Sequence, residues 1–306
     1  MSKAAALSKG SGKPAGAGQI GRKLLPYAMI APALLLFIVF VLYPVIYMLY
    51  VSFFDWNMIG DMTFIGLDNY TKMFSSSDFR TILMNTFKYI LMYVPPTIII
   101  SLLLALYLKR NTKINRLLQA AVFLPYIVSM VSISFVWTWM MNADTGLFNY
   151  WLGLIGLDGI NWLGDTKWAM FSLVLVNVWR GLGYYVLIFL AALQGVPENL
   201  YEAAALDRAK SFTVFFKITL PMISPTLFYA LLMCIIAAFK TFESVSIMTG
   251  GGPGNSTNVL TYYIYQQGFQ YYKTGYASAM GVVMLLMVGA LTLFYFGVLQ
   301  KKVHYQ

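Results

Sequence analysis

The sequence predicts an all-α polytopic membrane protein with six transmembrane helices, both termini in the cytoplasm and a helical elbow in one cytoplasmic loop. The first observation is composition: 59% of the 306 residues are hydrophobic, and the mean hydropathy is +0.69. Only 10% of the residues are charged, against about 25% in a typical soluble domain. The other two observations are a series of long apolar segments and a one-sided distribution of Lys and Arg.

Each predicted membrane span is an apolar segment of at least about 20 residues, the length that crosses a bilayer as a helix. Proline residues within or beside these segments predict kinks, which membrane helices tolerate. The six segments are about Leu24–Phe54, Phe87–Leu108, Leu117–Met141, Trp168–Leu193, Met222–Met248 and Tyr276–Leu299.

The positions of Lys and Arg predict the orientation, because cytoplasmic loops are enriched in these residues. One set of alternate loops and both termini carry Lys3, Lys9, Lys13, Arg22, Lys23, Lys109, Arg110, Lys113, Arg116, Arg208, Lys210, Lys217, Lys301 and Lys302. The opposite loops carry Lys72, Arg80, Lys167 and Lys273 beside several Asp residues. Both termini are therefore predicted to be cytoplasmic, with residues 1–23 as a flexible basic tail and residues 24–306 as the membrane domain.

The scarcity of reactive side chains argues against enzymes and metalloproteins. Cys234 is the single cysteine and His304 the single histidine, so neither a disulfide nor a cysteine or multi-histidine metal site can form within the chain. We expect no catalytic residue, no metal and no cofactor bound by this chain. The net charge of +10 follows membrane topology, so we do not expect nucleic acid as a partner.

Six tryptophans gather near the predicted outer ends of the spans, where an interfacial aromatic belt is expected. One or two of them could instead line a path for sugar rings. They are Trp56, Trp137, Trp139, Trp151, Trp162 and Trp168.

A polar island between the fourth and fifth spans, Tyr201 to Pro225, is unusual in so apolar a chain. Pro197 suits the first residue of a helix, and Glu198 near its start and Lys210 near its end suit the helix dipole. Ser211 is typical of a cap for a second short helix. The pattern predicts a helix–turn–helix elbow over about residues 196–221, although a pair of interfacial amphipathic helices would give similar periodicity.

The residues of this island resemble the conserved cytoplasmic loop of the permease subunits of bacterial ATP-binding-cassette (ABC) importers. The matching positions are Glu202, Ala203, Ala204, Asp207, Ala209, Ile218, Leu220 and Pro221. That family usually has glycine where this chain has Arg208. Six spans with the loop between the fourth and fifth look like the carbohydrate-importer branch, similar to the maltose and glycerol-3-phosphate permeases. The stretches FIGLDNY (Phe64–Tyr70) and TGGGPGNSTNVL (Thr249–Leu260) also fit that branch.

The resemblance implies a non-catalytic permease in a bacterial cell membrane. It implies that the elbow docks on a cytoplasmic ATPase, through Glu202, Ala203, Ala204, Asp207, Arg208, Ala209, Leu220 and Pro221. The implied partners are two ATPase subunits that use ATP and Mg, a second homologous permease, an external solute-binding protein and the lipid bilayer. The expected function is half of a sugar or oligosaccharide path that works by alternating access. The alternatives are a glycerol-3-phosphate or phosphodiester importer permease, an ion-gradient-driven carrier or channel, and a membrane-embedded enzyme.

Ionisable residues inside spans are hypotheses about function, because charge is costly in a bilayer. Arg180, with Trp179 and Tyr184 beside it, either faces the translocation cavity or has a packing role. Lys240 and Glu243, three residues apart, form either a local ion pair or, with Phe239, part of the cavity or gate.

Overall fold

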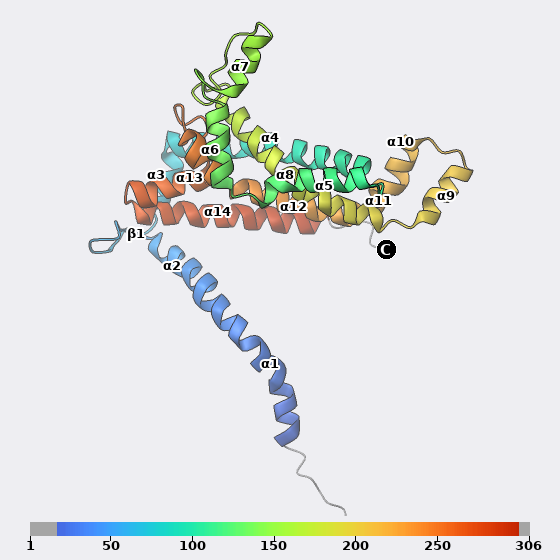
Figure 1. Ribbon diagram of the computed structural model, residues 1–306. Helices are drawn as coiled ribbons and strands as arrows, with labels where there is room; N and C mark the ends of the chain where they lie inside the picture. Colours follow the sequence, from blue (N-terminus) through green and yellow to red (C-terminus); the bar gives the residue numbers. More distant parts are fainter. Residues whose placement is uncertain (1–16, 300–306) are drawn as a thin grey trace, which may run out of the picture. The chain divides into compact units, whose positions relative to one another are not determined.

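The computed structural model describes residues 17–299, and the chain divides into two units between Tyr50 and Val51. The first unit contains helix α1 (Ala17–Phe37), the π-helical turn η1 (Ile38–Leu42) and most of α2 (Tyr43–Val51) (Figure 1). Helix α1 starts earlier than the predicted Leu24, within the segment predicted as a tail. Residues 1–16 of that tail, together with Lys301, Lys302 and His304, lie outside the described residues.

The second unit is built almost entirely of helices, with one short antiparallel pair of strands in its described part (Figure 1). In chain order its elements are β1 (Phe54–Asp55), β2 (Thr63–Phe64), α3 (Asp68–Ser75), α4 (Ser77–Leu108), α5 (Lys113–Ile127), α6 (Met130–Met140), α7 (Leu147–Leu154), α8 (Ala169–Gln194), α9 (Glu198–Leu206), α10 (Ser211–Val214), η2 (Phe215–Thr219), α11 (Leu220–Met222), α12 (Ser224–Phe239), η3 (Val245–Thr249), α13 (Leu260–Tyr265), η4 (Gln266–Gln270), α14 (Thr274–Phe294) and η5 (Tyr295–Leu299). In the strand pair, Phe54 lies opposite Phe64.

Four single helices in the described residues are long and apolar enough to cross a membrane, and two further crossings are bent helix pairs. The single helices lie at Pro26–Val51, Ser77–Leu108, Ala169–Gln194 and Thr274–Gly297. The bent pairs are Lys113–Ile127 with Met130–Met140, at 97°, and Ser211–Met222 with Ser224–Phe239, at 72°. Four to six crossings are therefore available by length and composition.

The predicted third and fifth spans are both interrupted. In the third, the break follows Pro125, one of the prolines at which a kink was expected. Helix α5 ends at Ile127 because the next two residues, Val128 and Ser129, have extended backbone with ψ of 143° and 131°. Helix α12 ends at Phe239, and the chain becomes helical again only at Glu243. Hydropathy shows apolar length, but it does not show these breaks.

Helices α4 and α8 form the centre of the second unit, with α5 packed on α8 and α12 packed on α4. A glycine allows the close approach of α5 to α8: a Cβ atom at Gly183 would lie 2.5 Å from the carbonyl oxygen of Val122 and 2.6 Å from the Cα of Phe123. Large buried side chains such as Tyr89, Leu173 and Phe189 belong to the core that these helices share. The packing brings a cavity-lining face of α8 against α4 and α5.

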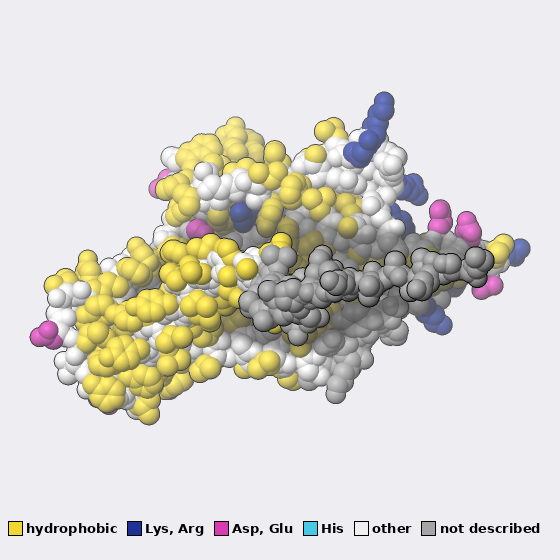
Figure 2. All heavy atoms as spheres, turned by 90° about the horizontal axis from the view of Figure 1, so that it is seen from below, with side chains coloured by type: hydrophobic (Ala, Val, Ile, Leu, Met, Phe, Trp, Pro, Cys, Tyr) yellow, Lys and Arg dark blue, Asp and Glu magenta, His cyan; other side chains and the backbone are white. Residues whose placement is uncertain are grey.

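Charged side chains are unevenly distributed over the surface. On the face shown in Figure 2, most described side chains are hydrophobic, and the visible Lys and Arg side chains gather mainly toward one end. At the end of the second unit formed by the elbow, Lys109 from α4 lies beside Tyr201 of α9. The loop after α4 thus lies beside the elbow, which follows α8, at one end of the bundle.

Candidate functional site

The polar island folds as a helix–turn–helix between α8 and α12, and its helix starts differ from two details of the prediction. Pro197 has ψ of 131°, so it precedes α9 as the N-cap residue, and Glu198 is the first helical residue. Lys210 is likewise the N-cap of α10, which places Ser211 inside the helix without a side-chain cap bond. The helices form where expected, one residue away from the predicted boundary.

Helix α9 ends in a Schellman motif. The Arg208 N–H donates to the Ala205 carbonyl (3.0 Å), and the Ala209 N–H donates to the Ala204 carbonyl (2.9 Å). This pattern requires a left-handed residue, and Arg208 has φ of +51°. Glycine adopts that conformation without a Cβ penalty. The position where the resembling family usually has glycine is therefore the position where the backbone turns left-handed.

The two sides of α9 differ in exposure. Ala204 is buried at 7% exposure and faces the protein, whereas Glu202, Ala203, Asp207 and Arg208 are exposed. The exposed residues of α9 and the turn after it thus include the carboxylates of Glu198, Glu202 and Asp207, the Arg208 guanidinium group and the small side chain of Ala203. Small residues such as Ala203 allow another protein surface to approach closely.

The elbow is tied to the helices that enter the membrane. The hydroxyl groups of Tyr201 and Thr219 form a hydrogen bond of 3.1 Å, and the Lys109 ammonium group lies 5.1 Å from the centre of the Tyr201 ring. Leu220 and Pro221 are half-buried in α11, directly before α12. These contacts join α9 to the end of α4 and to the segment that leads into α12.

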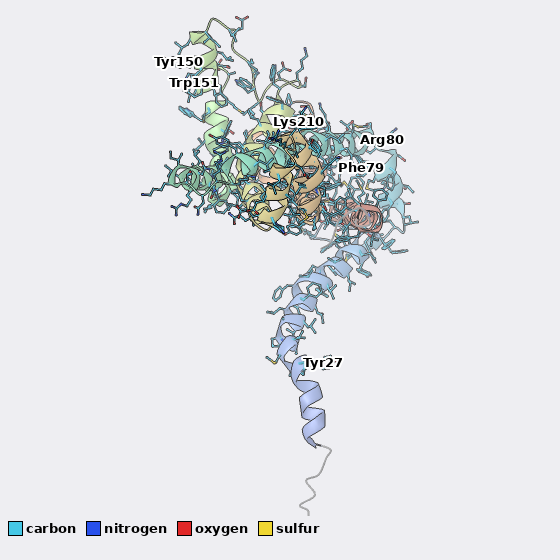
Figure 3. The ribbon with its side chains drawn as sticks, turned by 90° about the vertical axis from the view of Figure 1, so that its right-hand side faces the viewer. Tyr27, Phe79, Arg80, Tyr150, Trp151 and Lys210 are labelled. Carbon is cyan, nitrogen blue, oxygen red and sulfur yellow. The ribbon has the colours of Figure 1, made fainter. Side chains whose placement is uncertain are left out.

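An apolar groove of about 730 Å³ lies between the end of α4 and the elbow. Phe212, 74% exposed, lines one side and Lys109 stands at the groove as its single charged lining residue. Lys210, labelled in Figure 3, is exposed and directly precedes Ser211, another residue of the lining.

A second cavity, of about 250 Å³, lies between α4, α5, α8 and α12, and Arg180 is its single charged lining residue. It is lined by Tyr93, Tyr126, Asn177, Arg180, Gly181, Tyr184, Tyr185, Met233 and Ala237. Asn177, Arg180, Gly181 and Tyr184 recur at helical spacing, so they share one face of α8.

Arg180 has few partners for a guanidinium group. Its Nη2 donates to the Tyr126 carbonyl at 3.5 Å, and its Cζ lies 5.5 Å from the centre of the Tyr126 ring. Its Nε is buried and has no hydrogen-bond partner in the structure. Tyr126 also stacks on Tyr184, with ring centres 5.0 Å apart, so α5 and α8 hold the aromatic wall together.

The other predicted path residues lie outside this cavity. Trp179 packs on Trp137 at 5.3 Å and lines a separate apolar groove of about 360 Å³ at the α5–α6 bend. Phe239 is buried, 2% exposed, and its ring meets Phe87 edge-on. The structure therefore brings only Arg180 and Tyr184 together in the cavity.

Lys240 and Glu243 are both exposed, and they form no ion pair within the described part of the chain. The expected local pair depended on a shared helix face. Helix α12 ends at Phe239, so the two side chains are not one helical turn apart on a continuous helix.

Sequence reasoning missed most of the cavity wall. Asn177 lies three residues before Arg180, a helical spacing that could have identified it; its Nδ2 donates to Ser244 Oγ at 3.0 Å. Tyr93 and Tyr126 come from other helices and carry no local signal. The tertiary structure alone places them beside Arg180.

On the predicted outer side, Asn149 of α7 organises the arm formed by α6, α7 and the following loop. Its Nδ2 donates to the carbonyls of Ala143 (2.8 Å) and Ile160 (2.9 Å). Its Oδ1 accepts from the Ile160 N–H (3.0 Å) and from Trp162 Nε1 (2.9 Å). The Asn149 side chain thus joins α7 to the residues before and after it through four hydrogen bonds.

Several of the tryptophans predicted as a belt form a connected group of rings within this arm. Trp162 contacts Phe148 and Trp168, at centre distances of 5.8 and 5.5 Å. Tyr150 and Trp151, labelled in Figure 3, are exposed on α7. The arm therefore has a packed aromatic interior and an exposed aromatic tip.

The loop Thr249–Leu260 is held against the beginning of α4. Thr86 Oγ1 accepts from the Leu260 N–H at 2.9 Å, and Asn85 Nδ2 donates to the carbonyls of Asn255 (2.6 Å) and Asn258 (3.3 Å). These bonds join parts of the chain far apart in sequence.

Comparison with known proteins agrees with this architecture. Residues 97–305 match the family described as "Binding-protein-dependent transport system inner membrane component". The chain is 36% identical over 276 residues to the probable ABC transporter permease protein YurN of Bacillus subtilis (strain 168), covering 89% of this chain and 94% of YurN. It is 33% identical over 285 residues to the sulfoquinovosyl glycerol transport system permease protein SmoG of Agrobacterium fabrum (strain C58 / ATCC 33970), covering 92% of each.

A solved structure of an ABC transporter has the same fold as this chain. A chain of a bacterial alginate ABC transporter, crystallised in complex with an alginate pentasaccharide-bound periplasmic protein, superposes with a TM-score of 0.83 at 25% identity. The superposition covers 94% of this chain and 99% of that chain. The protein belongs to the family of binding-protein-dependent transport system inner membrane components, the permease subunits of ABC importers.

Proposed function

We propose that this chain is a non-catalytic subunit that forms half of the translocation path for a sugar or oligosaccharide, moved by alternating access. The observation that carries the proposal is the exposed side of α9, with Glu202, Ala203 and Asp207 on an elbow packed against α4 and leading into α12. A separate ATPase, two copies per transporter, uses ATP and Mg and docks on this side. Family membership supports the proposal.

Family membership also supports the remaining components of the transporter. A second homologous permease supplies the other half of the path, and an external solute-binding protein delivers the cargo. One relative is named for sulfoquinovosyl glycerol, and the structural relative is an alginate transporter, so sugars of varied chemistry are carried on this fold. The protein lies in a bacterial cell membrane with both termini in the cytoplasm, an orientation supported by the basic loops that meet at the elbow.

The elbow transmits force by contact. Closure of the ATPase pair moves α9, and the Tyr201–Thr219 hydrogen bond and the Lys109–Tyr201 contact carry that movement to the membrane helices. The Schellman turn at Arg208 keeps α9 at a defined angle to α10. Because protein interiors are close-packed, such a displacement moves helices as bodies.

For the substrate path we assign Arg180 and Tyr184, which share the cavity between α4, α5, α8 and α12. Trp179 lines the separate apolar groove at the α5–α6 bend. Phe239, Lys240 and Glu243 stay predictions of the sequence. An importer of glycerol-3-phosphate or a phosphodiester would use the same elbow and ATPase. An ion-driven carrier needs no ATPase, so its elbow would have no docking partner.

Substitution on the exposed side of α9 tests this function. Ala203→Arg places a long cation where we propose that the ATPase approaches, so the copurified ATPase and ATP-driven uptake in proteoliposomes should both be lost. Ala143→Arg, an equally exposed alanine on the predicted outer side, is the matched control and should retain both.

Two results would contradict the proposal. One is Ala203→Arg with normal ATPase association and uptake. The other is uptake by the reconstituted chain alone under a sodium or proton gradient, which would indicate a secondary carrier.

A further inference from the structure

The guanidinium group of Arg180 lies in a cavity that leaves its charge uncompensated. Its Nε is buried without a partner, and its one hydrogen bond, to the Tyr126 carbonyl, is long at 3.5 Å. No Asp or Glu is among the residues that line the cavity, and Arg180 forms no ion pair within residues 26–297. A charge removed from water is costly unless it is paired, so this arrangement suits a group that receives its partner from outside.

We infer that the Arg180 cavity binds the anionic group of an acidic sugar, such as a carboxylate, a phosphate or a sulfonate, during transport. Guanidinium groups bind carboxylate and phosphate oxygens through two parallel N–H donors. A guanidinium group has five N–H donors, and one hydrogen bond, from Nη2, is found for Arg180 within the described residues, so donors remain for such a ligand. The inference rests on the proposed function, and it narrows the cargo from sugars in general to sugars that carry negative charge.

The remainder of the cavity suits the neutral part of such a ligand. Tyr93, Tyr126, Tyr184 and Tyr185 supply aromatic surface and hydroxyl groups, and Asn177 supplies an amide. These groups can donate to and accept from sugar hydroxyls without adding a second charge. The lining therefore combines one fixed cation with neutral hydrogen-bonding groups.

The size of the cavity limits what enters it. At about 250 Å³ it is smaller than the roughly 300–1,000 Å³ of pockets for drug-sized ligands. One charged sugar unit suits this space better than a whole oligosaccharide. A longer cargo would pass through it unit by unit or extend toward the half of the path made by the second permease.

A purely structural role for Arg180 would rest on its contact with the Tyr126 ring, at 5.5 Å. That contact needs only a cation above the ring and leaves the Nε donor unused. The two roles predict different behaviour toward ligands, because a structural arginine would not distinguish an acidic sugar from its neutral counterpart.

The test uses the complete importer, with its ATPase subunits and second permease, purified in nanodiscs. The probes are glucuronate, galacturonate, glucose 6-phosphate and sulfoquinovose, each compared with the neutral glucose or galactose, and the readout is Tm against probe concentration. A bound ligand raises Tm in proportion to its occupancy of the folded state. We expect at least one acidic probe to raise Tm where its neutral counterpart does not.

Variants assign the effect to Arg180. Arg180→Gln should raise the concentration of acidic probe needed for half of the Tm shift at least tenfold, because a hydrogen bond to a charged group is lost. Lys88→Gln removes an exposed cation from α4 outside the cavity and should leave the response as in the wild type. Arg180→Lys is measured beside it, so that a variant remains if Arg180→Gln fails to assemble. Lysine keeps the charge but lacks the planar pair of donors of a guanidinium group, and should also weaken the response.

The inference is overturned if no acidic probe exceeds its neutral counterpart, or if both Arg180 variants respond like the wild type. Failure of the proposed function looks different. In that case the ATPase would not copurify and ATP-driven uptake would be absent, whatever the probes did.

Discussion

Replacing Arg208 with glycine is expected to stabilise the end of α9. Arg208 holds a left-handed backbone at φ of +51°, and its exposed side chain has no hydrogen bond or ion pair in the described part of the chain. A side chain in that conformation costs about 1–2 kcal/mol. Glycine removes this cost, but it loses about 0.5–1 kcal/mol through the greater freedom of the unfolded chain. The net gain is about 0.5–1 kcal/mol in the free energy of local opening.

Hydrogen exchange of the full transporter in nanodiscs measures this gain. The reporters are the Arg208 and Ala209 amides, which donate to Ala205 and Ala204 in the Schellman turn. A gain of about 0.5–1 kcal/mol slows exchange about two- to fivefold. Because glycine keeps the turn, the copurified ATPase should be retained.

Two further variants test whether the left-handed backbone at Arg208 is the cause of the expected gain. Arg208→Val, a β-branched residue that is strained at positive φ, should speed exchange at the same amides. Arg116→Gly, the same substitution at an exposed helical position of α5, should destabilise its helix by about 1 kcal/mol. Equal effects of glycine at Arg208 and Arg116, or unchanged exchange in both Arg208 variants, would refute the backbone argument.

Three other substitutions test the packing that positions the site. Gly183→Ala should lower Tm by an amount equivalent to about 1–3 kcal/mol, because its Cβ would meet the α5 backbone; Gly289→Ala, where nothing lies within 4 Å, is the control, and equal Tm values would contradict the close approach. Thr86→Val should cost about 1–3 kcal/mol by leaving the buried Leu260 N–H unpaired, seen as faster exchange of that amide; wild-type exchange would show that another group satisfies it. Asn149→Ala should make residues 142–168 sensitive to limited proteolysis, since four hydrogen bonds are lost, and unchanged resistance would show that the aromatic rings suffice.

The elbow shows how far local sequence reaches. Glu198, Lys210 and the flanking prolines predicted two short helices because capping preferences and dipole effects act within a few residues. The helix starts were misplaced by one residue, since the extended ψ of Pro197 and Lys210 is a backbone property that residue type only favours. The sequence did not predict the left-handed turn at Arg208, because an arginine does not indicate a positive φ.

The Arg180 cavity shows where local sequence stops. Arg180 and Tyr184 were found because a cation inside an apolar segment is rare and the two residues are four apart on one helix. Lys240 and Glu243 are also charged residues in an apolar segment, three residues apart, but both side chains are exposed. Helix α12 ends at Phe239, so the two residues do not lie on one continuous helix. A break in a helix depends on what packs around it, and composition does not record that.

The sequence by itself determined the class of protein, the approximate apolar segments, the expected orientation and the elbow, because these depend on hydropathy averaged over about 20 residues and on short-range capping. Only the tertiary structure decided how sharply two segments bend, by 97° and 72°, and which side chains share a cavity. Those outcomes follow from contacts between distant residues, such as the approach of α5 to Gly183 and the stacking of Tyr126 on Tyr184. The charge of Arg180 can be read from the sequence, but the absence of a counter-charge among its neighbours is a property of the folded chain.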